Sequence, residues 1–207
     1  MTAAMNERRA NGSGLSPREA AFVTDLSEKT INQAIDRAEV EPLPARRMDD
    51  RERMLGFPDL VYLRMRGQVG DLLSSEGKRR LRQELLLQAQ GNKKVRIVNI
   101  GPLRVDVAAA VDEMTERMAE IPRLWSFISV DPNVRAGEPV VRGTRIGVHT
   151  LADLARQGAS TEELLEDYPS LTAESLEAAL AWARMYPRRG RPPSATWQGG
   201  TVIRRGS

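Results

Sequence analysis

Residues 138–151, "EPVVRGTRIGVHTL", place two glycines and two arginines between short valine and isoleucine runs. The stretch lacks the Lys-Ser/Thr of a phosphate-binding P-loop and the strand-first GxGxxG of a dinucleotide fold. It instead predicts a tight reversal over residues 142–145, where Gly143 supplies a backbone conformation that other residues adopt at a cost. A hairpin this short is marginal alone, so we expect a partner sheet, for which the same element of a second subunit is one candidate.

Three helices are expected after this reversal. "HTLADLARQG" reads as a helix ended by Gly158, and "STEELLEDY" as one opened by a Ser160-Glu163 capping box. The third, "TAESLEAALAWARMY", is apolar on two faces, which indicates burial both by its own domain and by a partner or dimer mate. The predicted dimer interface comprises Val141, Ile146, Ala178, Trp182 and Met185.

The N-terminal part predicts two short helices with a turn between them. Ser16, Pro17 and Glu19 form a capping box with proline at the first helical position, and Ser27 caps a second helix. The second helix and the loop or small wing after it carry long polar side chains that can reach bases and phosphates from the major groove. The predicted DNA-binding residues are Lys29, Thr30, Asn32, Gln33, Arg37, Arg46 and Arg47. Glu28 and Asp36 dilute this signal, and a solvated helix face is the alternative.

In the middle of the chain the hydrophobic pattern changes from the period of helices to the alternation of strands. "FPDLVYLRMRGQV" and "EGKRRLRQELLLQAQG" read as helices, whereas residues 95–107 alternate around Gly101-Pro102 and predict a hairpin. A stripe then follows at helical spacing, which fits either a plain core helix packed on the hairpin or a helix that pairs with its copy in a dimer. Its residues are Val107, Val111, Met114, Met118 and Ile121. "LWSFISVDP" reads as a strand.

These patterns predict a mostly α protein with small β elements, of the α+β class. Residues 1–14 are expected to be disordered, and 15–91 to form a helix-turn-helix DNA-binding domain with following helices. Residues 92–125 are expected to form a β-hairpin plus helix connector. A small three-helix dimerisation domain with a short hairpin is predicted for 126–187, and a basic flexible tail for 188–207.

Composition excludes several kinds of site. The chain has 207 residues, no cysteine and one histidine, His149, so it offers neither thiolate chemistry nor a multi-histidine metal cluster. His149 lies at a predicted helix start, where packing or capping explains it better than catalysis. We therefore expect no enzyme activity, cofactor or metal. Because no window approaches the roughly 20 apolar residues of a membrane span and the N-terminus is polar, we expect a soluble cytoplasmic protein.

Residues 15–43 resemble the helix-turn-helix of MerR-like and excisionase-like DNA-binding domains. The resemblance is carried by "LSPREAA", by the serine before the second helix, and by "AIDRAEVEPL". The motif is short and degenerate. It implies that this unit reads double-stranded operator DNA.

Residues from about 128 to 186 resemble family four-three-three of the domains of unknown function. The ordered pattern is Asp131-Pro132, Gly137-Glu138-Pro139, residues 142–146, 158–160, Glu162-Glu163-Leu164, 168–171 and 178–182. Proteins of that family are commonly VapB-type antitoxins encoded beside a toxin with a PIN-like ribonuclease fold. The resemblance implies a type II antitoxin that neutralises such a toxin and represses its own operon, as a homodimer or a larger toxin–antitoxin assembly.

The tail differs in charge from the unit before it. Residues 131–186 hold nine acids against five arginines, whereas the last twenty-one residues hold five arginines and no acid. Guanidinium groups can pair with the carboxylate cluster expected of a PIN-like active site. The predicted toxin-binding residues are Arg188, Arg189, Arg191, Trp197, Arg204 and Arg205. Phosphate contact on DNA is the competing use of the tail. A stand-alone transcription regulator without a toxin and a protein-interaction adaptor are the alternatives for the whole chain.

Overall fold

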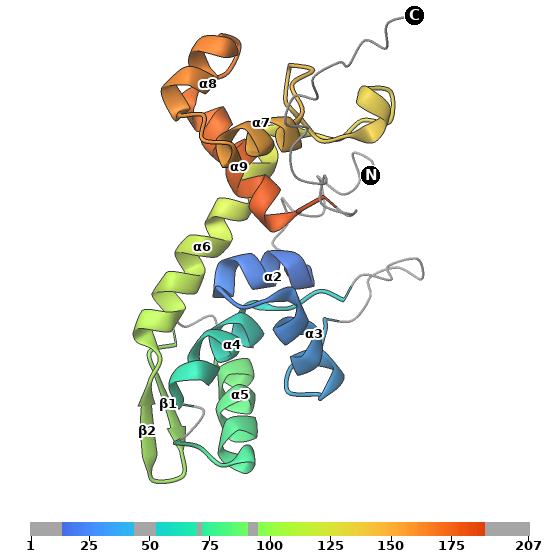
Figure 1. Ribbon diagram of the computed structural model, residues 1–207. Coiled ribbons are helices and arrows are strands. Elements are labelled where there is room, and N and C mark those ends of the chain that lie inside the picture. Colours follow the sequence, from blue (N-terminus) through green and yellow to red (C-terminus); the bar gives the residue numbers. More distant parts are fainter. Residues whose placement is uncertain (1–13, 44–52, 70–71, 91–94, 189–207) are drawn as a thin grey trace, which may run out of the picture.

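The computed structural model describes residues 14–43, 53–69, 72–90 and 95–188 (Figure 1). Helices dominate these ranges, and their strands form two antiparallel pairs. The mostly helical α+β class predicted from the sequence is confirmed. Figure 1 shows two lobes, one from the N-terminal half and one from the C-terminal half, and a long helix, α6 (Ala108–Ser126), that runs from one to the other.

Helices α2 (Pro17–Thr24) and α3 (Glu28–Asp36) are the two short helices expected near the N-terminus. The Ser16 hydroxyl accepts from the Glu19 backbone N–H and the Glu19 carboxylate accepts from the Ser16 N–H, so the predicted capping box is confirmed. Ser27 caps α3 by accepting from the Thr30 N–H. The side chains that are fully buried on these two packed helices are Ala20, Val23, Ile31 and Ala34.

Helices α4 (Phe57–Val69) and α5 (Ser75–Gln90) complete the helical part of the N-terminal lobe, as predicted. Helix α4 lies at its centre and packs against α2, α5 and α6. A buried ion pair joins α4 to α5. Arg82 Nε of α5 donates to Asp59 Oδ1 of α4 at 2.7 Å, and the Asp59 side chain is 2% exposed. Burial raises the pKa of Asp59, although the hydrogen bond and charge of Arg82 lower it.

The predicted hairpin consists of β1 (Ile97–Ile100) and β2 (Leu103–Asp106), joined at Gly101-Pro102 with Ile100 opposite Leu103. Its buried face carries Val98 and Ile100 and lies against α5. Directly opposite residues share a face, so this register leaves Ile97 half-buried beside the exposed Asp106.

Helix α6 carries the apolar stripe predicted after the hairpin. Val111, Met114 and Ile121 are buried, and the helix packs on α4 and α2 within the same chain. The prediction of a core helix is therefore confirmed, but α6 packs mainly on α4, α2 and α9 rather than on the hairpin. The self-pairing alternative loses its support because these side chains are already covered.

The strand predicted from "LWSFISVDP" is mostly wrong. Leu124 and Trp125 belong to the last turn of α6, and only β3 (Ile128–Ser129) is extended. The two side chains lie three and four residues after Ile121, so a continued helix buries them on the same face. This packing overrides the strand preference of aromatic residues.

Residues 138–151 form the predicted reversal. After the short helix η1 (Arg135–Gly137), strand β4 (Val140–Val141) leads into a turn in which Gly143 has φ +77°, and Val141 N–H donates to the Ile146 carbonyl at 3.0 Å. The expectation of a partner sheet from a second subunit is corrected. Strand β4 pairs with β3 of the same chain, with Ile128 opposite Val141.

The three predicted C-terminal helices are α7 (Val148–Arg156), α8 (Thr161–Asp167) and α9 (Ala173–Met185). Gly158 has φ +104° after α7, and the Ser160-Glu163 capping box opens α8. These features confirm the helix boundaries predicted there.

Helix α9 is buried on both stripes, but its second face is covered by α6 and α2 of the same chain rather than by a partner (Figure 1). Trp182 packs against Trp125 of α6 with ring centroids 5.6 Å apart. The dimer-interface prediction is corrected for four residues that are interior, each at most 5% exposed: Val141, Ala178, Trp182 and Met185. Ile146 is partly buried against the same core.

Candidate nucleic-acid interface

One face of α3 presents three long polar side chains to solvent. Lys29, Gln33 and Arg37 are spaced by four residues, so they form a single stripe along the helix and its last turn. All three are exposed, and none makes a side-chain hydrogen bond or ion pair with any part of the chain that the structure describes. The stripe is therefore available to an external ligand.

The two acids of α3 are each paired with an arginine. Arg18 Nε of α2 donates to both Glu28 carboxylate oxygens, the shorter contact being 3.1 Å, and Arg53 Nη1 donates to Asp36 Oδ1 at 2.7 Å. These carboxylates would otherwise repel a phosphate backbone that carries one charge per ~1.7 Å of duplex axis. The pairing leaves α3 and its immediate contacts net positive through Lys29 and Arg37.

Two other predicted DNA-binding residues are engaged inside the protein. Asn32 donates through Nδ2 to the Glu28 carbonyl at 3.0 Å and accepts through Oδ1 from Arg53 Nη2 at 2.8 Å. The Thr30 hydroxyl lies 2.8 Å from the Ser27 hydroxyl. In the free protein these two side chains stabilise α3 and its N-terminal cap. They differ in this from Lys29, Gln33 and Arg37, whose side chains form no hydrogen bond or ion pair with a described residue.

Arg53 lies in a segment whose backbone pairs with residues before α2 and after α3. Leu43 N–H donates to the Met54 carbonyl at 2.7 Å, and Leu15 and Leu55 exchange backbone hydrogen bonds of 2.8 and 2.9 Å. Leu43 and Met54 are therefore held together, and Arg53 beside them reaches α3. Arg46 and Arg47 lie outside the described residues. Sequence reasoning missed Arg53, since nothing in the spacing of "MDDRERM" shows that it reaches back to α3.

Helix α9 does not present such a face. Its exposed side chains include Glu174 and Glu177, and the aromatic and apolar remainder is interior. A helix that is buried on both sides and exposes two glutamates near its N-terminal end is poorly placed to insert into a major groove. Of the two helices, α3 is therefore the one that presents an exposed, positively charged polar face.

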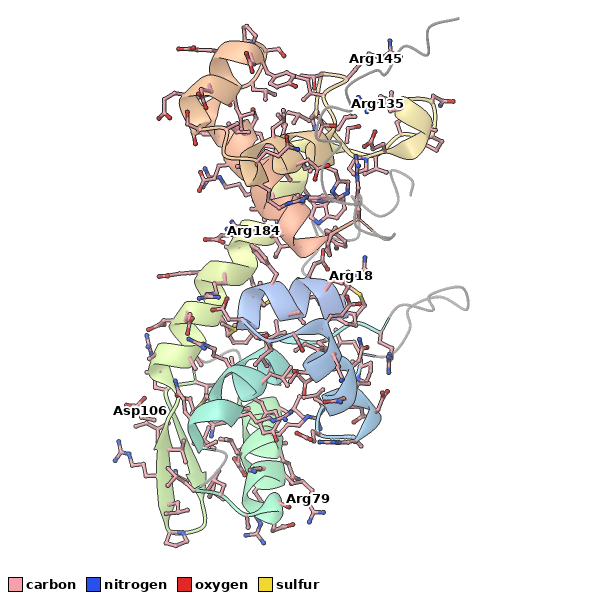
Figure 2. All side chains as sticks on the ribbon, in the orientation of Figure 1. Arg18, Arg79, Asp106, Arg135, Arg145 and Arg184 are labelled. Carbon is pink, nitrogen blue, oxygen red and sulfur yellow. The ribbon has the colours of Figure 1, made fainter. Side chains whose placement is uncertain are left out.

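Arg142, in the turn after β4, and Arg135, in η1, bond groups within the same unit. Arg142 donates through Nε to the Ser126 carbonyl at 2.6 Å and through Nη2 to the carbonyls of Trp125 and Ile128 at 3.2 and 2.9 Å. The Trp125 and Ser126 carbonyls are among those that the end of α6 leaves open, and the Ile128 carbonyl belongs to β3. Arg135 donates to the Arg145 carbonyl and pairs with Glu138. Figure 2 labels Arg135 and Arg145, which lie near each other in the C-terminal lobe.

Arg188, the first predicted toxin-binding residue, is tied to the C-terminal lobe. Its guanidinium pairs with Glu138 at 2.8 Å and with Asp153 at 3.6 Å. Burial alone would raise the pKa of Glu138, but Arg135 and Arg188 together hold that pKa below its usual value. The other predicted toxin-binding residues lie outside the described residues: Arg189, Arg191, Trp197, Arg204 and Arg205.

His149 is a packing residue at the start of α7. It is 8% exposed, and its ring meets Trp182 edge-on with centroids 5.8 Å apart. Burial, followed by the charge of Arg188, lowers the pKa of His149, so the neutral imidazole is favoured near pH 7. Among the described residues no group of three or more metal-ligating side chains occurs, and no described helix is long and apolar enough to cross a membrane.

A family model described as "Protein of unknown function (DUF433)" matches residues 128–183, which span β3 to α9. The part of the chain that is similar to the DUF433 domain is therefore residues 128–183. The family expected from the sequence pattern is confirmed for this part of the chain. Within this domain, Gly143 lies in the reversal, Arg142 bonds carbonyls at the end of α6, and Ser160 and Glu163 cap α8.

Relatives of known sequence or structure also match. A DUF433 member protein from Anabaena variabilis ATCC 29413, solved by crystallography, is 37% identical over 37% of this chain and 75% of its own, with a TM-score of 0.30. The uncharacterized protein y4eO of Sinorhizobium fredii (strain NBRC 101917 / NGR234) is 35% identical over 89 residues, which are 43% of this chain. The chain spans only 40% of that relative's length. The crystal structure of Rv2018 from Mycobacterium tuberculosis is 17% identical over 80% of this chain and 96% of its own, with a TM-score of 0.30.

Proposed function

We propose that the chain is the antitoxin of a type II toxin–antitoxin pair, which binds operator DNA through its N-terminal unit and a PIN-like ribonuclease through its C-terminal part. The observation that carries the DNA-binding half is the exposed Lys29, Gln33 and Arg37 stripe on a helix whose acids are neutralised. The toxin half rests on the resemblance of the DUF433 domain to VapB-type antitoxins and on the charge of the tail.

The proposed DNA contact follows from the stripe's chemistry. A glutamine side chain can pair with two atoms of an adenine edge, and lysine or arginine can contact guanine or phosphate oxygens. Helix α3 is the second helix of the α2–α3 pair, the position that a helix-turn-helix uses in the major groove. Asn32 and Arg53 then act as positioning residues, because they join α3 to the adjoining wing-like segment.

Replacing Gln33 by alanine should weaken binding to the DNA upstream of the chain's own gene by about 1–3 kcal/mol, roughly five- to 150-fold, because a bidentate base contact is lost. Replacing Lys29 should reduce the salt slope of binding by about 1 if it contacts a phosphate. Fluorescence anisotropy of a labelled duplex across a salt series measures both. Gln157→Ala, an exposed glutamine at the end of α7, is the matched control. Unchanged affinity in Gln33→Ala and Lys29→Ala would remove α3 as the reading helix.

The proposed toxin contact uses the arginine-rich end of the chain. PIN-like ribonucleases hold divalent metal with a carboxylate cluster, and guanidinium groups can form bidentate pairs with such carboxylates. Arg188 sets where this end leaves the DUF433 domain, through Glu138 and Asp153. The arginines beyond it would then supply the charges that face the partner.

Co-expression with the ribonuclease encoded beside this chain should relieve its growth arrest, and the two proteins should co-purify. Replacing Arg189, Arg191, Arg204 and Arg205 by alanine should release the toxin while leaving DNA binding intact. If the same variant instead weakens DNA binding and flattens its salt dependence, these arginines contact phosphates.

A stand-alone transcription regulator is the second candidate, and the same stripe on α3 favours it. Sequence-specific binding to the upstream duplex without any capture of the neighbouring gene product would select this function over the antitoxin.

A further inference from the structure

Glu19 is a buried carboxylate whose two oxygens serve different parts of the chain. The residue is 0% exposed, and Oε2 accepts from the backbone N–H and from the hydroxyl of Ser16, both at 2.9 Å. Oε1 accepts from Trp125 Nε1 at 3.2 Å, although Trp125 lies 106 residues later, in the last turn of α6. The first oxygen closes the capping box of α2, and the second joins α2 to the end of α6.

The indole of Trp125 is held by two rings from the C-terminal end of α9. Trp182 and Tyr186 each lie edge-on to it, with ring centroids 5.6 Å away, and the three rings form an aromatic cluster. Edge-to-face contacts favour particular ring directions, so they help to set where the indole N–H points. Trp125 and Tyr186 lie outside the range that matches the family, residues 128–183, one on either side of it. The joint to α2 is therefore built from residues that flank the DUF433 match.

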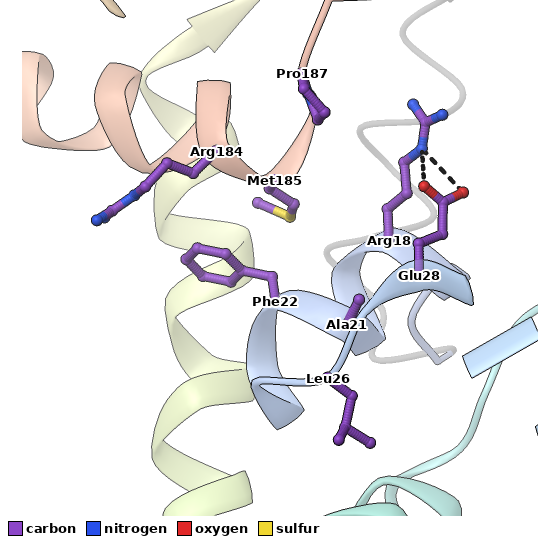
Figure 3. Close-up of a pocket in the computed structure, with 8 residues that line it drawn as sticks. All are labelled: Arg18, Ala21, Phe22, Leu26, Glu28, Arg184, Met185 and Pro187. Atoms are coloured by element: carbon purple, nitrogen blue, oxygen red, sulfur yellow. Dashed lines mark hydrogen bonds and ion pairs between the residues drawn. The ribbon is translucent and has the colours of Figure 1, made fainter. Parts of the chain in front are cut away.

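A second connection reaches the first turn of α3. The Arg18 guanidinium lies 5.9 Å from the centre of the Tyr186 ring, and Arg18 Nε donates to both carboxylate oxygens of Glu28. Figure 3 shows this bond, and Arg18 and Glu28 line one pocket together with Met185 and Pro187 at the end of α9. Helices α2 and α3 also pack on each other. Each helix of the pair is thus connected to the C-terminal lobe through its first turn.

A helix that reads bases must enter the groove in one orientation, so whatever fixes that orientation affects affinity. We infer that the aromatic cluster orients the α2–α3 pair for DNA through Glu19, which makes Glu19 a positioning residue. The inference rests on the proposed DNA-binding function and adds that buried residues of the C-terminal lobe contribute to operator affinity. Helix α6 packs on both α2 and α9, so loss of the Glu19 bond loosens the joint without separating the lobes.

Two matched pairs of substitutions in the full-length chain test Glu19. Glu19→Gln keeps an acceptor for the capping box, where glutamine also serves, but it turns an amide NH₂ toward the Trp125 N–H. Glu163→Gln makes the same change in the capping box of α8, where the carboxylate bonds to no described residue outside its own box. Trp125→Phe removes the indole donor. Trp182→Phe removes the same atoms from the same cluster, but the Trp182 N–H has no acceptor among the described residues.

Two measurements are made on each variant. Fluorescence anisotropy of the labelled upstream duplex gives the affinity, and double electron–electron resonance gives the orientation. Because the chain has no cysteine, Gln33→Cys and Gln157→Cys place one spin label on α3 and one at the end of α7, in chains used for distances alone. We expect Glu19→Gln and Trp125→Phe to broaden the distance distribution. If one fifth of the molecules keep the competent orientation, the apparent affinity falls about fivefold. Glu163→Gln and Trp182→Phe should match wild type in both measurements.

The outcomes separate this inference from the function beneath it. If the wild-type chain does not bind the duplex, the proposed DNA-binding function fails and the inference fails with it. If wild type binds and Glu19→Gln binds equally well, only the positioning role is overturned, whatever the distances show. Equal losses of affinity in Trp125→Phe and Trp182→Phe would assign the effect to packing of the cluster and would also overturn it. Thermal unfolding of each variant, with a midpoint well above the temperature of the binding assay, excludes misfolding as the cause.

Discussion

Trp182→Ala should lower the free energy of unfolding by about 3–5 kcal/mol, the range for truncating a buried tryptophan. Trp182 is 5% exposed and joins three aromatic side chains, with ring centroids 5.6 Å from Trp125, 5.8 Å from His149 and 4.8 Å from Tyr186. Alanine leaves a cavity where α9, α6 and α7 meet, and rigid helices refill such a space only in part. Denaturant unfolding monitored by circular dichroism measures the loss.

The same variant tests the interior position of Trp182 against an interface position. An interior residue destabilises each chain equally at every protein concentration, whereas an interface residue would shift the dissociation constant of a dimer. Leu72→Ala, with a side chain 80% exposed, serves as the control and should change stability by less than about 0.5 kcal/mol. A concentration-dependent midpoint for Trp182→Ala would restore the dimer-interface interpretation.

Arg82→Met should cost about 3–5 kcal/mol near neutral pH, because it leaves the buried Asp59 carboxylate without its cation. The loss should depend on pH. The folded pKa of Asp59 is raised above its ordinary value of 3.8, so its contribution to stability is present below that value and is lost as pH rises through the folded pKa. Without Arg82 the folded pKa rises further, and the loss deepens over a wider range of higher pH.

Urea unfolding between pH 4 and pH 8 measures this dependence. In Arg82→Met the stability should fall more steeply with rising pH than in wild type, and adding Asp59→Asn should remove the extra slope. Arg80→Met on the same helix breaks an exposed pair with Glu76 and should have little effect. Equal pH profiles for Arg82→Met and wild type would mean that Asp59 does not depend on Arg82.

Local signals in the sequence predicted the helices well. The Ser16-Glu19 and Ser160-Glu163 capping boxes, the hairpin turn and Gly158 each depend on neighbours within a few residues, so they can be recognised without the fold. The exposed part of the candidate site, Lys29, Gln33 and Arg37, was predicted for the same reason, since one helix period places it.

Contacts between distant segments could not be predicted in this way. Two apolar stripes on α9 indicate two covering surfaces, but they do not say that α6 and α2 of the same chain supply the second. Trp125 continues α6 because it meets Trp182 and Tyr186, which follow it by more than fifty residues. Arg53 and Arg142 likewise bond groups whose proximity arises only in the folded chain.

The burial of α9 against α6 and α2 determines where this protein can be truncated without exposing apolar surface. The family boundary at residues 128–183 excludes Ile121 and Trp125, and it also excludes Glu19, which accepts from Trp125 Nε1 at 3.2 Å. A fragment limited to that boundary would expose the apolar face of α9 to water and would be prone to self-association. The unit defined by sequence relationship therefore omits residues that cover α9, and we expect a soluble fragment to begin before α2.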